Sequence, residues 1–196
     1  LYRHHRKTPF TENQLETAGM IALMIILSSI PWFFKDTYFE LDTRAHMMRI
    51  EGVYEGLADH QLPVIIYPNY CNDFGELGIL YPDLFLYFPA VLRKLGVSMM
   101  TSYRALMFSV CAAKVLVMYF SSLTVLKSRK AAMIASAVYI FEPYRMYNMY
   151  FRGSGAGSEI AGIFLPLVIA GVFSILFDEK KKWYLLALGM TGIMQS

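Results

Sequence analysis

The sequence has little charge and very little cysteine. Only 17% of its 196 residues are charged, whereas about a quarter are charged in a typical soluble domain. The apolar residues make up 56% of the chain and are grouped in runs, with the charges between them. This organisation is not that of an ordinary soluble enzyme; it is typical of an integral membrane protein.

Several chemical signatures are also missing. The two cysteines, Cys71 and Cys111, lie far apart, so there is neither a disulfide framework nor a CxxC metal site. The net charge of +3 is dispersed along the chain, which argues against nucleic acid as a partner. No Gly-Lys-Ser/Thr follows the glycines at 153–157, so this stretch is not a Walker-type phosphate loop. There is no internal repeat and no second, soluble domain.

The apolar runs predict four membrane-spanning helices and the start of a fifth, since a helix rises about 1.5 Å per residue. The third is the least regular, because its apolar part ends at Phe141. Bulky residues at the end of the first run indicate a retained helix, not a cleaved signal peptide. The chain lacks an initiator methionine and stops within an apolar stretch, so we expect a single transmembrane domain that is the amino-terminal part of a longer protein. The predicted runs are 18–34, 103–126, 131–147, 160–177 and 183–196.

Basic residues mark alternate connections between these runs. They gather in the leader 1–17, at 127–130 and at 180–182. Because short cytoplasmic segments hold the excess of Lys and Arg, we expect a cytoplasmic N-terminus, with segments 35–102 and 148–159 on the outer face. The predicted fold class is an all-α, multi-pass helix bundle with a large first extracytoplasmic loop that contains amphipathic surface helices.

The first outer segment contains two helical patterns. Apolar residues recur at three- and four-residue spacing from Asp42 to Leu57, which predicts an amphipathic helix at the membrane surface, ended by 61–63. A second apolar piece, 79–95, contains prolines and a basic pair. We expect it to be a surface or re-entrant helix, with a full span as the alternative.

Three polar residues share one face of the first pattern. Asp42, His46 and Arg49 follow at i, i+4 and i+7. A carboxylate near the outer surface can act as a general base or bind a cation. The alternative is that Asp42 caps the helix and that His46 is a hydrogen-bonded surface histidine.

The second outer segment joins two arginines to a glycine-rich turn. Arg145 and Arg152 are seven residues apart, and the turn leads directly into the fourth run. Arginines next to the free N–H groups of a helix start form a plausible phosphate cradle. The alternative is a flexible loop whose arginines reach lipid phosphates.

Lys114 lies near the middle of the second run. A charged residue at that depth is a functional candidate or half of a buried pair. No acid in the predicted spans is an obvious partner, so a structural pair with a helix outside this sequence is expected ahead of a substrate contact. In a transporter or lipid flippase, Lys114 would be the substrate or coupling site.

The order of these features resembles the first outer loop of the GT-C superfamily of polytopic glycosyltransferases. Within it, the chain is similar to bacterial membrane proteins described as having a 6-pyruvoyl-tetrahydropterin synthase-related domain. The residues that carry the resemblance are Asp42 to Gly52, Gln61 to Pro63, Pro143 to Arg145, Arg152, Gly153 and Glu159.

The resemblance implies transfer of a sugar from a polyprenyl-phosphate carrier to a cell-envelope acceptor, on the outer face of a bacterial plasma (inner) membrane. Asp42 would be catalytic. A divalent cation would bind Asp42 with Glu40 as a substitute for the second acid of many relatives, because Thr43 follows Asp42 here. A transporter or flippase, or a non-catalytic scaffold of the same fold, is the alternative. The substrate-binding residues would be His46, Arg49, Arg145, Arg152 and Glu159.

Overall fold

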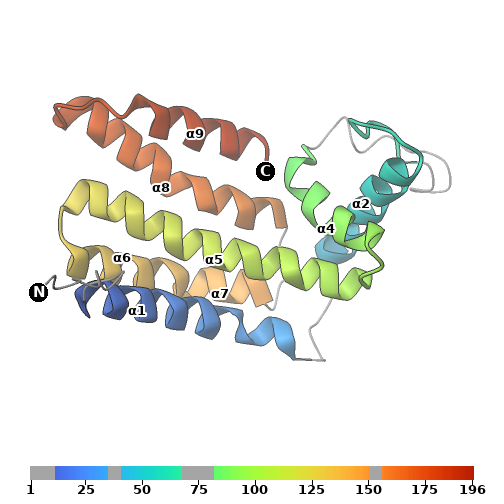
Figure 1. Ribbon diagram of the computed structural model, residues 1–196, viewed down its shortest axis with the longest axis horizontal. Helices are drawn as coiled ribbons and strands as arrows, with labels where there is room; N and C mark the ends of the chain where they lie inside the picture. Colours follow the sequence, from blue (N-terminus) through green and yellow to red (C-terminus); the bar gives the residue numbers. More distant parts are fainter. Residues whose placement is uncertain (1–11, 35–40, 68–81, 151–155) are drawn as a thin grey trace, which may run out of the picture.

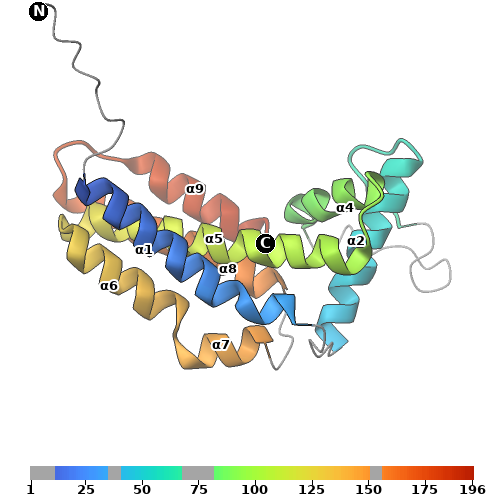
Figure 2. The ribbon, with the colours of Figure 1, turned by 60° about the horizontal axis from the view of Figure 1, so that its bottom comes forward.

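The computed structural model describes residues 12–34, 41–67, 82–150 and 156–196, and the regular structure of these residues is all helical. Helices α1, α5, α6, α8 and α9 run side by side, and α2 crosses their direction at one end of the bundle (Figures 1 and 2). The elements are α1 (Glu12–Ser29), η1 (Ile30–Phe33), α2 (Leu41–Ala58), η2 (Leu84–Leu86), α4 (Tyr87–Lys94), α5 (Met99–Leu126), α6 (Arg129–Ile140), α7 (Pro143–Tyr150), α8 (Ala156–Phe177) and α9 (Trp183–Met194).

Three of the described helices are long and apolar enough to cross a membrane: Gln14–Phe33, Met99–Leu126 and Ala156–Phe177. They correspond to the predicted runs 18–34, 103–126 and 160–177, and each begins a few residues earlier than predicted. Helix α5 starts early because the Ser98 hydroxyl accepts a hydrogen bond from the Thr101 amide at 3.2 Å. Helix α9 is apolar but shorter.

The predicted run 131–147 is two helices, α6 and α7, and not one span. The Glu142 carboxylate accepts hydrogen bonds from the amides of Tyr144 and Arg145, at 3.1 and 2.7 Å. It therefore caps a new helix, and Pro143 in its first position disfavours helical geometry at the residue before it. Helix α6 has 12 residues, or about 18 Å, which is less than the roughly 30 Å of bilayer hydrocarbon.

The first outer segment contains the amphipathic helix that its periodicity predicts. In α2, Ile50 and Val53 are fully buried, and Met47 and Tyr54 pack against the same core. The helix ends at Ala58, and His60 then adopts a left-handed conformation with φ 63°. In both views α2 lies across the bundle axis, the orientation expected of a surface helix (Figures 1 and 2).

The second apolar piece does not span, as expected. Its helix α4 has eight residues, about 12 Å in length, and it packs against α2 and α5. The guanidinium of Arg93 binds both carboxylate oxygens of Glu51 in α2, at 2.9 and 2.8 Å. This bidentate pair holds α4 against α2.

Two basic connections lie at the end of the bundle opposite α2 (Figure 1). Lys127, after α5, pairs with Asp178, after α8, at 3.1 Å. This pair places residues 127–130 beside residues 178–182, and we call these two segments the basic end. The opposite end, where α8 begins and α2 lies, is the α2 end.

Glycines allow α8 and α9 to approach closely. A Cβ atom at Gly171 would overlap the backbone of Leu186, and one at Gly189 would lie 2.8 Å from the backbone nitrogen of Val168. Because lipid is as apolar as the helix surfaces, such close packing is a main source of association between membrane helices.

We expect Gly171→Ala to destabilise the protein by about 1–3 kcal/mol, because the backbone of Leu186 cannot rotate away from the added methyl group. Gly19→Ala is the matched control. It lies within α1 with no atom within 4 Å of the added Cβ, and we expect it to stabilise α1 by about 0.5–1 kcal/mol. Thermal unfolding in detergent, followed by circular dichroism, measures both. Equal unfolding temperatures for the two variants would contradict the packing argument.

Candidate functional site

Two of the predicted site residues lie on the first turns of α2. Asp42 is in the first turn, where the helix dipole stabilises a negative charge, and it is exposed. His46 is one turn further and half-buried. The neighbouring Thr43 is buried and hydrogen-bonds Tyr103 of α5. This contact fixes the start of α2 on the bundle and leaves the Asp42 carboxylate open to solvent.

His46 faces the start of α8. With Arg49 it lines a small space that Gly157 and Ile160 of α8 also border, and whose volume of about 10 Å³ is room for one water. Burial, together with the charge of Arg49, lowers the pKa of His46 from 6.5 to about 4. The imidazole is therefore neutral at neutral pH. Its Nδ1 is buried, with no hydrogen-bond partner among the described residues.

Arg49, predicted to bind substrate, takes part in a buried structural contact. Its Nη2 donates to the Asp83 carboxylate at 2.7 Å and to the Pro82 carbonyl at 3.0 Å. The Tyr67 hydroxyl donates to the second oxygen of Asp83. Both charged residues are only 8% exposed. The contact joins α2 to the segments that contain Tyr67 and Asp83. The guanidinium of Arg49 is therefore engaged in holding these segments together.

Lys114 has a partner inside the chain, which corrects the expectation of a helix outside this sequence. Its Nζ donates to the carboxylate of Glu159 in the first turn of α8, and the two residues are 1% and 6% exposed. The segment 148–159, predicted as an outer loop, therefore ends in the first turn of α8. Glu159 lies inside the bundle, and in hydrocarbon neither charge could remain unpaired without a large penalty.

Gly162, one turn after Glu159 in α8, lies against both Lys114 and Arg145. A Cβ atom there would lie 3.2 Å from Arg145 Nη1 and 3.2 Å from Lys114 Cε. Arg145 lies over the Tyr139 ring, 4.0 Å from its centroid. Its Nη1 is buried, with no hydrogen-bond partner among the described residues. The Arg145 guanidinium thus lies beside the Lys114–Glu159 pair, next to the first turns of α8.

Tyr139 completes this cluster through a second contact with Gly162. Pro166 lies inside α8 and has no N–H for the Gly162 carbonyl, four residues earlier. The Tyr139 hydroxyl donates to that carbonyl at 2.5 Å. The buried cluster therefore comprises Lys114, Arg145, Glu159, Gly162 and Tyr139.

The structure thus brings the predicted residues into two groups at the α2 end. Asp42 and His46 form an outer group on α2, and Arg145 and Glu159 join Lys114 in the buried cluster. Tyr103 of α5 contacts Thr43, the residue next to Asp42. Arg152 and Glu40 lie outside the described residues.

The described residues do not fit the divalent cation that the resemblance implies. Among them, no group of three or more His, Cys, Asp or Glu side chains could hold a metal ion. Glu40, the second acid that the resemblance implies, lies outside the described residues, so we derive no step through a metal.

Sequence reasoning missed Asp83, Tyr67 and Tyr139. Asp83 and Tyr139 lie within segments that were considered only for their apolar character. The signal that was available for Asp83 was an acidic residue within a largely apolar segment, 82–92, which requires a partner once it is buried.

We expect Lys114→Met to destabilise the protein by about 3–5 kcal/mol, because it leaves Glu159 buried and unpaired. The double variant Lys114→Met/Glu159→Leu should recover most of that loss, since it removes both charges. Lys127→Met is the matched control. Its ion pair is exposed, so the loss should be below about 1 kcal/mol. Thermal unfolding in detergent measures all three, and a double variant no more stable than Lys114→Met would contradict the pairing.

We expect His46 to make stability fall as the pH is lowered from 6.5 to 4. In this range the unfolded chain binds a proton at His46 and the folded chain does not. The free energy of unfolding should therefore decrease by up to about 3 kcal/mol and level off below pH 4. Unfolding measured across this range should lose that component in His46→Gln and keep it in His60→Asn, since His60 is exposed. An unchanged pH profile in His46→Gln would exclude a buried neutral imidazole.

Comparison of the chain with protein-family models, curated proteins and solved structures finds no match. The chemistry of this end of the bundle must therefore be inferred from its own side chains. It offers an exposed carboxylate, a neutral imidazole, a buried lysine–glutamate pair and a half-buried guanidinium beside that pair.

Proposed function

We propose that the chain belongs to a membrane glycosyltransferase-like protein of the GT-C type. In this proposal it transfers a sugar from a polyprenyl-phosphate donor to a cell-envelope acceptor at the α2 end. The observation that carries the proposal is the concentration of reactive groups there: the exposed Asp42 and the cluster of Lys114, Arg145 and Glu159 belong to the same end of a membrane bundle.

The excess positive charge of the buried cluster supports an anionic ligand. The Glu159 carboxylate pairs with Lys114, and Arg145 lies beside this pair with its Nη1 unbonded among the described residues. The first N–H groups of α8 have no helical partners within their own helix. A phosphate near this helix start would meet a guanidinium and a positive helix end. Arg145 is the group we assign to it, because the Lys114 ammonium is already paired with Glu159.

Asp42 is the residue we assign as general base. The carboxylate would take the proton of an acceptor hydroxyl, whose oxygen forms a new bond to the anomeric carbon of the sugar. The bond between that carbon and the phosphate oxygen breaks, and its electron pair leaves on the polyprenyl phosphate. Arg145 would stabilise the charge of the departing phosphate.

Membrane orientation follows from the distribution of basic residues. The connections 127–130 and 178–182 lie together at the basic end, and short cytoplasmic segments are rich in Lys and Arg. In the proposal the basic end, and with it the N-terminus, is cytoplasmic. The α2 end then lies on the outer face of a bacterial plasma membrane, where polyprenyl-phosphate sugars and cell-envelope acceptors would meet.

We expect Asp42→Asn to reduce sugar transfer by about 10²–10⁴-fold, because Asn keeps the size of Asp42 but cannot accept a proton. The measurement is mass spectrometry of cell-envelope glycans in cells that express the intact full-length protein or the variant at matched levels. One specific sugar decoration should be lost. The gene deletion is the reference, and it must lose the same decoration.

Asp59→Asn is the matched control, since Asp59 is an exposed acid at the other end of the same helix region. Its glycan profile should equal that of the wild type. A profile unchanged in Asp42→Asn but altered in the deletion would remove the catalytic role. It would favour a transporter or lipid flippase built on the buried Lys114–Glu159 pair, or a non-catalytic scaffold.

A further inference from the structure

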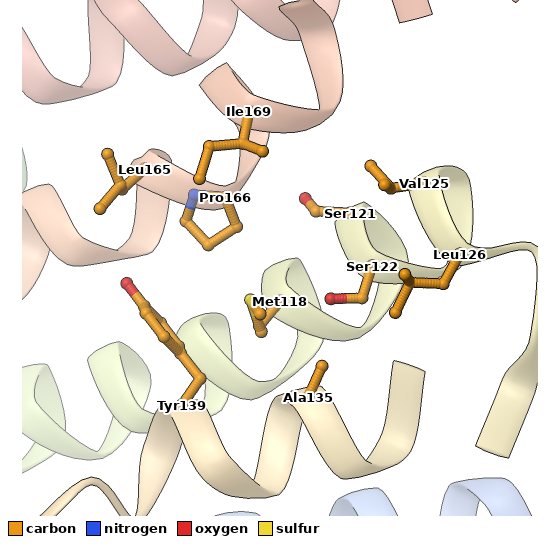
Figure 3. Close-up of a pocket in the computed structure, with 10 residues that line it drawn as sticks. All are labelled: Met118, Ser121, Ser122, Val125, Leu126, Ala135, Tyr139, Leu165, Pro166 and Ile169. Carbon is orange, nitrogen blue, oxygen red and sulfur yellow. The ribbon is translucent and has the colours of Figure 1, made fainter. Parts of the chain in front are cut away.

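A groove at the other end of the bundle has no part in the proposed chemistry. It lies between α5, α6 and α8 and has a volume of about 310 Å³. Figure 3 shows its side chains converging from the three helices around an open space. We call it the α6 groove and define it by Met118, Val125 and Leu126 of α5, Ala135 of α6, and Leu165 and Ile169 of α8.

The walls of the α6 groove are almost entirely apolar, and its rim is lipid-facing. Leu126, Leu165 and Ile169 are 49%, 47% and 59% exposed, and Ile134 on the outer side of α6 is 65% exposed. The Tyr139 hydroxyl at its inner end is already bonded to the Gly162 carbonyl. The side chains of Ser121 and Ser122 also line the groove (Figure 3). Because apolar atoms still make up almost all of the wall, an apolar group is the favoured occupant inside a bilayer.

The length of the groove suits a hydrocarbon chain. Its lining extends along α5 from Met118 to Leu126, about 12 Å. A flexible hydrocarbon chain can lie along a groove of this length, and the charges at the end of α5 decide which lipid would supply it.

One end of the groove lining, at Leu126, adjoins the basic end. Leu126 is followed directly by Lys127, and the next turn of chain adds Arg129 and Lys130, all of them exposed. Residues 180–182, three lysines, lie beside them through the Lys127–Asp178 contact. A hydrocarbon chain that leaves the groove at Leu126 would therefore place its headgroup near Lys127, Arg129 and Lys130, with residues 178–182 in the adjoining connection.

We propose that the α6 groove binds one acyl chain of an anionic phospholipid, whose phosphate is held by the exposed cations of the basic end. The lipid comes from the leaflet on that side of the membrane. Basic residues near a membrane surface attract anionic headgroups, and the apolar groove retains the chain. The inference does not depend on the proposed glycosyl transfer, which lies at the opposite end.

Native mass spectrometry tests the proposal. The full-length protein is reconstituted in phosphatidylcholine vesicles with and without phosphatidylglycerol, and the lipids that remain bound after gentle release into detergent are counted. The wild type should retain one phosphatidylglycerol in preference to phosphatidylcholine. Arg129→Gln/Lys130→Gln, which leaves the packing unchanged, should weaken this retention about tenfold.

Two further variants separate the groove from the rest of the lipid-facing surface. Ala135→Phe fills the groove and should abolish retention, while Ile134→Phe, on the exposed side of the same helix, should leave it unchanged. Ser122→Phe fills the groove from α5, so the test does not depend on one variant folding. Circular dichroism confirms the fold of each.

Three results would overturn the proposal. The first is retention of phosphatidylglycerol by folded groove-filling variants. The second is equal retention of phosphatidylcholine by the wild type, which removes the headgroup contact. The third is a dimer of the chain that Ala135→Phe dissociates, which would assign the groove to a second copy.

Discussion

The buried pair of Lys114 and Glu159 is the contact on which the arrangement of the bundle depends. A membrane interior provides no water to solvate either charge, so α5 and α8 must pack in the register that brings the two side chains together. Gly162 leaves room for this register, because a Cβ atom there would lie 3.2 Å from both Lys114 Cε and Arg145 Nη1 and would press on these side chains. The same glycine explains why Arg145 can join the pair.

The break between α6 and α7 follows from the same region. Arg145 can reach Gly162 only because the chain turns at Glu142 and Pro143 instead of continuing as one helix. Helix α6 is consequently short, and Tyr139 near its end contacts the Gly162 carbonyl that Pro166 leaves without a helical partner. Tyr139 therefore belongs to both places: it lines the inner end of the α6 groove, and it contacts Arg145 and Gly162 in the buried cluster.

The sequence was sufficient to predict the elements that depend on local pattern. Hydropathy located α1, α5 and α8, and the three- and four-residue spacing located α2, because each property is written along a single helix. Capping and proline effects shifted the boundaries, as at Ser98, and divided the run 131–147. These are contacts of one or two residues that an average over a long window does not register.

The contacts between distant segments could not be predicted in the same way. Lys114 and Glu159 are 45 residues apart, and Arg49 and Asp83 are 34 apart. The sequence indicated that Lys114 needed a partner, but Glu159 was placed in an outer loop because the start of α8 was predicted four residues late. Helical spacing grouped Arg49 with Asp42 and His46. Spacing cannot show that one of these three residues is covered by a distant segment of the chain, as Arg49 is by the segment that contains Asp83.

The two ends of the bundle differ in chemistry, and this difference has a physical consequence for how they can act together. At the basic end the charges are exposed and positive, so they interact with any anionic surface and are screened by salt. At the α2 end the charge of Lys114 is buried and neutralised by Glu159, and that of Arg145 is half-buried, so these charges are screened less and act on a group that enters the site. Attraction to a membrane surface and recognition of a specific anion are therefore separated along one set of helices.

Tyr139 lies between the charged cluster and the α6 groove. Its ring lies under Arg145, and the same side chain lines the groove. Because the Tyr139 hydroxyl is bonded to the Gly162 carbonyl and its ring lies under Arg145, this side chain separates the apolar groove from the charged cluster.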